Sequence, residues 1–191
     1  MLAAHAGQKS FGENYVLEGV EKIKACALAG LSSLDWHFIG PVQSNKTRLI
    51  AEHFDWVESV DRPKIAQRLS EQRPAHLPPL QVCVQVNVSG EASKQGCTPE
   101  ATESLCREIV SLPRLVLRGL MAIPEPVSGE AAQRAACRPL RTLFETLRPR
   151  LSKDAPQFDT LSIGMSHDLA AAVAEGATQV RIGTALFGVR R

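Results

Sequence analysis

The feature that most constrains the fold of this 191-residue chain is a regular alternation of short β-prone runs with longer helical segments. The predicted strands are 10–13, 36–39, 56–60, 81–88, 115–122, 160–163 and 179–182. The stretches between them have helical periodicity, and the predicted helices are 16–29, 44–53, 62–72, 99–111, 130–151 and 168–175. Strands that alternate with helices form parallel sheets through right-handed crossovers.

Residues with known preferences for helix ends support these boundaries. Thr98 and Pro99 follow the order expected of an N-cap and a first helical residue. Asp61 is expected to cap the helix that follows it. Gly30 and Gly176 stand where two helices should stop, because glycine readily adopts the backbone conformation that ends a helix.

The pattern predicts an α/β fold, a single (β/α)-barrel domain over residues 1–191 of the eight-stranded TIM-barrel type. The runs 81–88 and 115–122 mix apolar and polar residues, as expected where one face of a strand lines a barrel and the other meets helices. Seven strands are visible and the chain opens in a helix-like segment, so we expect the barrel to lack its first strand.

Composition argues against several other classes of protein. The net charge of +2 is too balanced to indicate a nucleic-acid or membrane partner. The five cysteines form no CxxC pair and no zinc-binding spacing, and they are expected to be reduced thiols. No apolar run is long enough to span a bilayer, and the first residues lack the organisation of a signal peptide. We expect a cytoplasmic monomer.

Glycines and hydroxyl residues gather after the last two predicted strands, where barrel enzymes often bind phosphate. Ser162, Gly164, Ser166, Gly183 and Thr184 offer close backbone N–H groups and hydroxyl donors, which a phosphate requires. The alternative is ordinary turn and cap chemistry, in which Ser166 caps the following helix and Gly183 turns the chain.

Three further polar residues lie near strand ends. Arg181 lies in an apolar strand, and alternation places it on the same side as Gly183. It needs an acceptor at the barrel mouth, which is either a structural carboxylate or a ring nitrogen of a ligand. His37 is interpreted as a core histidine beside Trp36, and Asn14 as a residue that closes a turn.

These segments also carry the motifs of a known family. The motifs are FGENY at 11–15, HFIGPVQSNK at 37–46, GLMAIP at 119–124, LSIGMS at 161–166 and RIGTALFG at 181–188. In this order and spacing they resemble the pyridoxal phosphate homeostasis protein family, whose fold is similar to the N-terminal barrel of alanine racemase. The resemblance runs from about residue 4 to the C-terminus.

The resemblance implies a largely non-catalytic carrier of pyridoxal 5′-phosphate (PLP) that controls intracellular PLP and amino- and keto-acid balance. Its partners would be PLP and PLP-dependent apoenzymes. The implied cofactor-binding residues are Asn14, His37, Ser162, Met165, Ser166, Arg181, Gly183 and Thr184. The region of Ser166, Gly183 and Thr184 would hold the phosphate. Arg181 would face the pyridine nitrogen, which suits a carrier or a racemase because the ring is then a weaker electron sink.

The chain departs from the family pattern at its start. Family members hold the cofactor's aldehyde as a Schiff base on a lysine of the first barrel strand, whereas Lys9 of this chain matches a later loop. We expect that lysine and its strand, on the order of 30 residues, to be missing through a misplaced start, a truncation or divergence. Lys46 or Lys94, near the predicted barrel mouth, are candidates to capture the aldehyde instead.

Three alternatives remain at this point. A PLP-dependent amino-acid racemase would need a second domain and a catalytic tyrosine from a partner, and the tyrosine of this chain, Tyr15, lies within the FGENY motif. A phosphosugar-binding barrel enzyme would have to use Glu13 or Lys94. A fragment without cofactor function would express in folded form but gain no stability from a ligand.

Overall fold

The structure is a computed structural model that describes residues 1–91 and 94–188. Its strands are β1 (Ser10–Glu13), β2 (Asp35–Phe38), β3 (Trp56–Val60), β4 (Leu80–Gln85), β5 (Leu115–Met121), β6 (Thr160–Met165) and β7 (Gln179–Arg181). Its helices are α1 (Leu2–His5), α2 (Val16–Leu28), α3 (Thr47–His53), α4 (Pro63–Gln72), α5 (Pro99–Ser111), α6 (Glu130–Leu151), α7 (Leu169–Ala174) and α8 (Thr184–Phe187).

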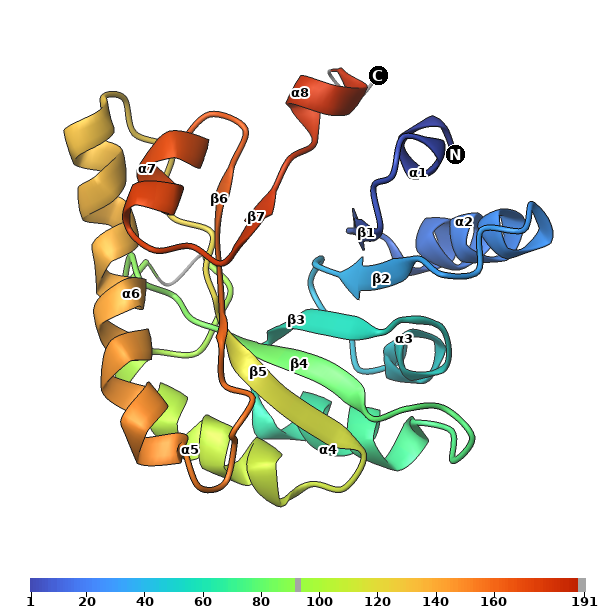
Figure 1. The fold of residues 1–191 in the computed structure, drawn as a ribbon. Coiled ribbons are helices and arrows are strands. Elements are labelled where there is room, and N and C mark those ends of the chain that lie inside the picture. The colour runs from blue at the N-terminus through green and yellow to red at the C-terminus, as the bar shows by residue number, and fades with distance from the viewer. Residues whose placement is uncertain (92–93, 189–191) are drawn as a thin grey trace.

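The strands form one parallel sheet in which each strand pairs with its neighbour in the chain, in the order β1 to β7. The sheet curls into a nearly closed barrel, and the helices lie outside it (Figure 1). In the described part of the chain β1 and β7 are the two edges of the sheet. The predicted barrel type, with seven strands visible, is confirmed.

Most boundaries agree with the prediction, and the differences have local causes. The strand predicted at 81–88 ends at Gln85, because the chain turns there. The Asn87 side chain donates to the Glu91 carbonyl at 2.8 Å, and Val86 bridges to Cys97. The short helix α8 was not predicted.

The predicted helix ends are confirmed in part. Thr98 Oγ1 accepts from the Ala101 amide at 3.3 Å. Gly30 and Gly176 have φ values of +79° and +86°, as the ends of α2 and α7 require. The cap predicted at Asp61 is wrong, because Asp61 binds the guanidinium of its neighbour Arg62, at 2.6 Å, and Arg62 itself precedes the helix.

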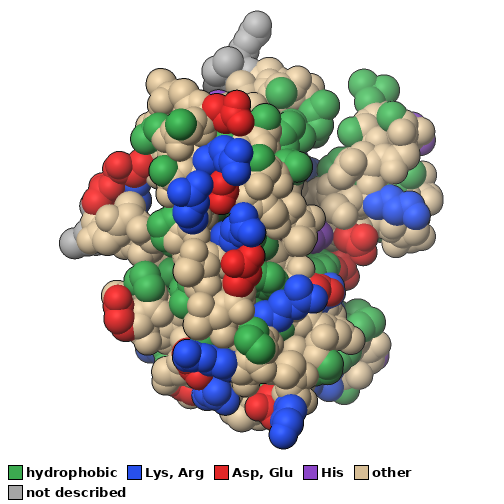
Figure 2. Space-filling view, turned by 60° about the vertical axis from the view of Figure 1, so that its left-hand side comes forward, with side chains coloured by type: hydrophobic (Ala, Val, Ile, Leu, Met, Phe, Trp, Pro, Cys, Tyr) green, Lys and Arg blue, Asp and Glu red, His purple; other side chains and the backbone are tan. Residues whose placement is uncertain are grey.

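The outer face of the molecule along α6 is charged. Figure 2 shows Lys or Arg side chains alternating with Asp or Glu side chains down this face. Glu175, just after α7, accepts from Arg134 Nε at 2.7 Å and from Arg138 Nη2 at 3.3 Å. Arg141 lies 3.6 Å from the same carboxylate, so three arginines of α6 hold α7 in place.

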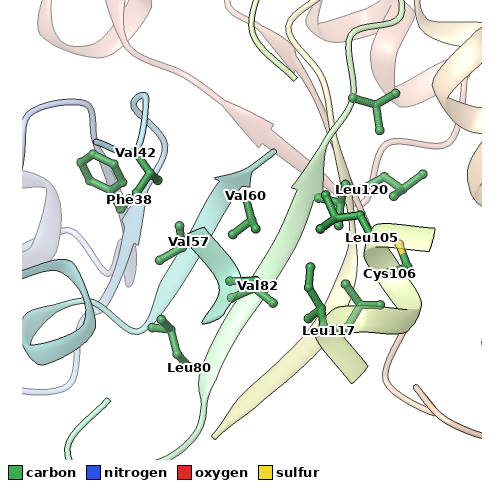
Figure 3. Packing of buried hydrophobic residues seen from close by; sticks show 14 of the residues in the cluster. Phe38, Val42, Val57, Val60, Leu80, Val82, Leu105, Cys106, Leu117 and Leu120 are labelled. Atoms are coloured by element: carbon green, nitrogen blue, oxygen red, sulfur yellow. The ribbon is translucent and has the colours of Figure 1, made fainter. Parts of the chain in front are cut away.

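The apolar core lies between the sheet and its helices. Val82, Leu117 and Leu120 of β4 and β5 are at most 3% exposed, and Leu105 and Cys106 of α5 cover them (Figure 3). Burial of apolar surface stabilises a fold by about 25 cal/mol per Å², so this layer stabilises the barrel.

Two features are absent from residues 1–91 and 94–188. No helix there is long and apolar enough to cross a membrane. The cysteines, all five of which lie in these ranges, form no disulfide.

Candidate functional site

The inside of the barrel is polar, in contrast to the core outside it. Side chains from four strands meet there: His37 of β2, Glu58 of β3, Ser162 of β6, and Gln179 and Arg181 of β7. Alternation along each strand turns these residues inward while their apolar neighbours face the helices. The result is a buried polar cluster that spans the barrel.

Glu58 is the centre of this cluster, and its side chain is fully buried. Its Oε1 atom accepts from Nδ1 of His37 at 2.7 Å and also contacts the amide nitrogen of Gln179. Its Oε2 atom accepts from the hydroxyl of Ser162 at 2.6 Å. The guanidinium of Arg181 lies 3.9 Å from the same oxygen.

These contacts keep the buried carboxylate charged. Burial alone would raise the pKa of Glu58, but the hydrogen bonds from His37 and Ser162 and the charge of Arg181 outweigh it and hold the pKa below its usual value. Burial lowers the pKa of Arg181, and Glu58 is the largest influence that opposes this. The cluster therefore contains a buried carboxylate–guanidinium pair, since arginine remains protonated in proteins.

The hydrogen bonds that link Arg181 to Glu58 through Ser162 run in one direction. Arg181 donates from Nη1 to the Ser162 oxygen at 2.5 Å and from Nη2 to the Ala122 carbonyl at 2.8 Å. A guanidinium cannot accept, so Ser162 must direct its single proton to the carboxylate. Further N–H donors of the guanidinium are not used in these two bonds.

This arrangement bears on the alternatives left open for Arg181 and Ser162. Arg181 does lie beside a structural carboxylate, with Ser162 in between. Ser162 is fully buried and its hydroxyl is used inside the cluster. Its geometry is that of a residue that orients Arg181, whereas the sequence had suggested direct phosphate binding.

The other predicted phosphate residues lie at adjacent strand ends. Met165 and Arg181 are partners in the β6–β7 register, so the segments that follow them, with Ser166 on one side and Gly183 and Thr184 on the other, begin side by side. Met165 and Ser166 are half-buried, and Gly183 and Thr184 are exposed. A Cβ atom on Gly183 would have no neighbour within 4 Å, which shows free space beside this backbone.

The alternative role of Ser166 as a helix cap is not seen. Asp168 is the residue that precedes α7, and its Oδ1 atom accepts from the Met165 amide at 2.6 Å. Gly164 allows the turn, because its φ is +102° and a Cβ there would lie 2.4 Å from Ala172. The hydroxyl of Ser166 is therefore not needed to start the helix.

Asn14 and His37 lie at different depths. Asn14 is exposed after β1, and its carbonyl oxygen would lie 2.1 Å from a Cβ on Gly40, so glycine is required at that position. His37 is buried and stacks on Trp56 with ring centroids 4.9 Å apart. His37 is buried, as the interpretation of it as a core histidine expects, but it belongs to the polar cluster inside the barrel and not to the apolar core.

Of the two lysines considered for aldehyde capture, Lys94 is held between carboxylates. Its Nζ atom lies 3.3 Å from Glu91 and 3.2 Å from Glu125. Desolvation lowers the pKa of Lys94, but the two glutamates outweigh it and raise the pKa overall. A lysine must lose its proton to attack an aldehyde, so this setting disfavours Lys94. Lys46 is half-buried just before α3.

Sequence reasoning missed Glu58 and Gln179. A signal for both was present. Glu58 is a charged residue in the apolar run of β3, and such a residue needs a buried partner. Gln179 stands two residues before Arg181 and so faces the same side of its strand.

Comparisons with known proteins identify the family to which the chain is related. The chain matches the family "Alanine racemase, N-terminal domain" over residues 1–191. It is 63% identical to the pyridoxal phosphate homeostasis protein of Pseudomonas aeruginosa over 188 residues, 98% of this chain and 77% of that protein. It is 53% identical to the protein of the same name from Escherichia coli, of which it covers 79%.

Solved structures give the same result. PipY of Synechococcus elongatus, with PLP bound, superposes with a TM-score of 0.86 at 36% identity and covers 97% of this chain and 84% of that chain. Alanine racemase of Corynebacterium glutamicum shares only the fold, with a TM-score of 0.65 at 13% identity. On this evidence the chain belongs to the pyridoxal phosphate homeostasis protein family.

Proposed function

We propose that this chain binds PLP at the carboxyl ends of its barrel strands and acts as a largely non-catalytic carrier of the cofactor. The observation that carries the proposal is the set of donors around Arg181. Ser162 and Ala122 accept two hydrogen bonds from the guanidinium. Its remaining N–H groups are donors for an acceptor such as the pyridine nitrogen of PLP. Structures of PipY, a relative at 36% identity, are known with PLP bound.

The phosphate fits the adjacent ends of β6 and β7. Backbone N–H groups near Ser166 and Gly183, with the Thr184 hydroxyl, supply the type of donors that phosphate needs. The free space beside Gly183 allows an anion to approach the backbone closely. Asn14, which follows β1, would line the barrel mouth at the other edge of the sheet. His37, which is buried inside the barrel, would support the site through its hydrogen bond to Glu58.

The charge of the site argues against reactions that need a strong electron sink, and it suits a carrier as well as a racemase. When bound, PLP supplies an electron-accepting ring whose strength depends on protonation of its nitrogen. A permanently charged guanidinium opposite that nitrogen keeps it unprotonated, and the ring then stabilises carbanions poorly. We further propose that the chain acts as a monomer in the cytoplasm and passes PLP to PLP-dependent apoenzymes. The free thiols are consistent with a reducing compartment.

The test is a titration of the 191-residue chain with PLP, followed by equilibrium dialysis. We expect saturable binding that Arg181→Met weakens by about tenfold or more, because a charge-assisted hydrogen bond is lost. Gly183→Ala should fold normally, since the added methyl group meets open space, and should weaken binding through contact with the phosphate.

Arg107→Met is the control, because Arg107 lies on α5 and pairs with Glu103, outside the polar cluster inside the barrel. It should bind PLP as the parent chain does. Equal affinity in the parent, Arg181→Met and Gly183→Ala chains would disprove the proposed site.

Whether a lysine of this chain captures the aldehyde of PLP needs a separate measurement. Borohydride reduction of the PLP-saturated chain, followed by peptide mapping, reports any lysine that has captured the aldehyde. We expect no modified Lys94, because its ammonium group is paired with Glu91 and Glu125. Modification at Lys94 would show that binding breaks these ion pairs.

A further inference from the structure

Glu58 connects the two sides of the proposed site. One oxygen of its carboxylate accepts from His37 on β2, and the other accepts from Ser162 on β6, which in turn accepts from Arg181 on β7. β2 lies beside one edge of the sheet and β7 is the other edge, and β1 and β7 are not paired in the described residues. The Glu58 carboxylate therefore ties together strands near the two edges of the barrel.

The contacts require an acceptor at this position. His37, Ser162 and Gln179 all direct N–H or O–H groups toward the same side chain. An ionised carboxylate accepts from all three. An amide of the same shape would turn a donor toward at least one of these groups, and a buried donor without an acceptor is costly.

The carboxylate also determines the electrostatic setting of Arg181, whose side chain is 10% exposed. Within the described residues, the carboxylate that lies within 4 Å of its guanidinium belongs to Glu58. Without that charge a buried cation would be left uncompensated, and it would move toward water or toward the phosphate of a ligand. The orientation of Arg181 thus depends on Glu58.

We propose that Glu58 is a positioning residue for recognition of the ring nitrogen, acting through Ser162 to hold Arg181 in the orientation in which it faces that nitrogen. This rests on the proposed function, in which PLP occupies the mouth of the barrel. Glu58 touches no ligand, and its role is to fix the donor that does. The specific consequence is selectivity for a ring that contains nitrogen.

The experiment compares two ligands across the parent chain, three variants and two controls. The ligands are PLP and a benzene analogue of it in which C–H replaces the ring nitrogen. The variants are Glu58→Gln, Ser162→Ala and their double variant, with the parent chain as reference. Ser70→Ala and Glu175→Gln are controls, because they alter a buried serine on α4 and a buried carboxylate after α7, both outside this cluster.

We expect the parent and both controls to prefer PLP over the analogue by about tenfold, the effect of one hydrogen bond to a charged group. Glu58→Gln and Ser162→Ala should reduce this preference to about twofold. Their affinity for the analogue should stay near that of the parent chain, because the contacts with its phosphate group are unchanged. The double variant should resemble each single variant, because both changes break the same connection.

A second measurement needs no cofactor. The ¹⁵N resonances of the His37 ring in the ligand-free chain should show a proton on Nδ1, and Glu58→Gln should shift or lose that signal whereas Ser162→Ala should retain it. If Glu58→Gln does not fold, Ser162→Ala alone still decides the selectivity.

The experiment distinguishes failure of the proposed function from failure of the proposed role of Glu58. If the parent chain binds neither ligand, the proposed function is wrong. If the parent prefers PLP and both variants keep the full preference, or lose affinity for both ligands equally, Glu58 has only a structural role and the inference is overturned.

Discussion

The guanidinium of Arg118 lies 4.7 Å from the centre of the Trp56 ring, where it lines the barrel close to the start of β3. The same guanidinium binds the Asp159 carboxylate at 2.8 Å and the Gln81 side chain at 3.0 Å. On its other side Trp56 stacks with His37. Arginine, indole and imidazole thus form a column inside the barrel that supports the Glu58 cluster.

Replacing Arg118 by Met tests this column. Met keeps much of the length of the side chain but removes the charge and the hydrogen bonds, so we expect the free energy of unfolding to fall by about 1–3 kcal/mol. Urea denaturation measures the change. Arg107→Met is the control, because Arg107 is half-exposed on α5 and its ion-pair partner among the described residues is Glu103. It should change stability by less than about 0.5 kcal/mol. Equal effects would mean that the column adds nothing.

The apolar layer outside the sheet makes a larger contribution. Leu120 of β5 is 0% exposed, and Leu120→Ala should lower the free energy of unfolding by about 2–5 kcal/mol, because it removes buried surface and leaves a cavity. Leu28→Ala makes the same chemical change at a position that is 91% exposed, and it should be nearly neutral. Thermal unfolding of the two variants gives the comparison. A mild effect at Leu120 would contradict the placement of the core.

Glu175 makes stability depend on pH. The arginines of α6, Arg134 first, lower the pKa of its carboxyl group. A lowered folded-state pKa contributes stability that is fully present above the unfolded value, about 4.3, and is lost as the pH falls through the folded value. We therefore expect Glu175→Gln to reduce stability at pH 7 and to flatten the fall in stability below about pH 4.3. A variant with the same acid dependence as the parent chain would refute this assignment.

The cysteines should differ in reactivity. Burial raises the pKa of Cys106 to about 12 and that of Cys137 to about 11, so both thiols remain protonated at neutral pH. Cys97 is only half-buried, although burial raises its pKa too. With iodoacetamide at pH 8, mass spectrometry should find Cys97 labelled before Cys106 and Cys137. Early labelling of Cys106 would indicate that α5 opens readily.

The fold could be predicted because its signals are local. The strands at 10–13 and 56–60 and the helices at 99–111 and 130–151 have the predicted boundaries, since period and end residues lie within each segment. The end of β4 and the cap at Asp61 were missed because side chains compete for the backbone there. The Asn87 side chain donates to the Glu91 carbonyl and stabilises a loop after β4, and the Asp61 carboxylate pairs with Arg62 instead of capping the helix.

The site was harder to predict than the fold. The approach of Met165 to Arg181 follows from strand pairing, and the motifs located it. The bond between Glu58 and Ser162 joins residues 104 positions apart across the barrel. It depends on how far the sheet curls, which no short segment of sequence encodes. The residue types at 58 and 162 indicated a need for partners without indicating which ones.

The separation of an apolar layer outside the sheet from a polar cluster inside it affects how such a barrel can evolve. The apolar core packs against the outer faces of the strands, so a change in the polar cluster inside the barrel opens no cavity in that core. A scaffold with its apolar packing on one face of the sheet and its polar cluster on the other allows the two sets of residues to change separately.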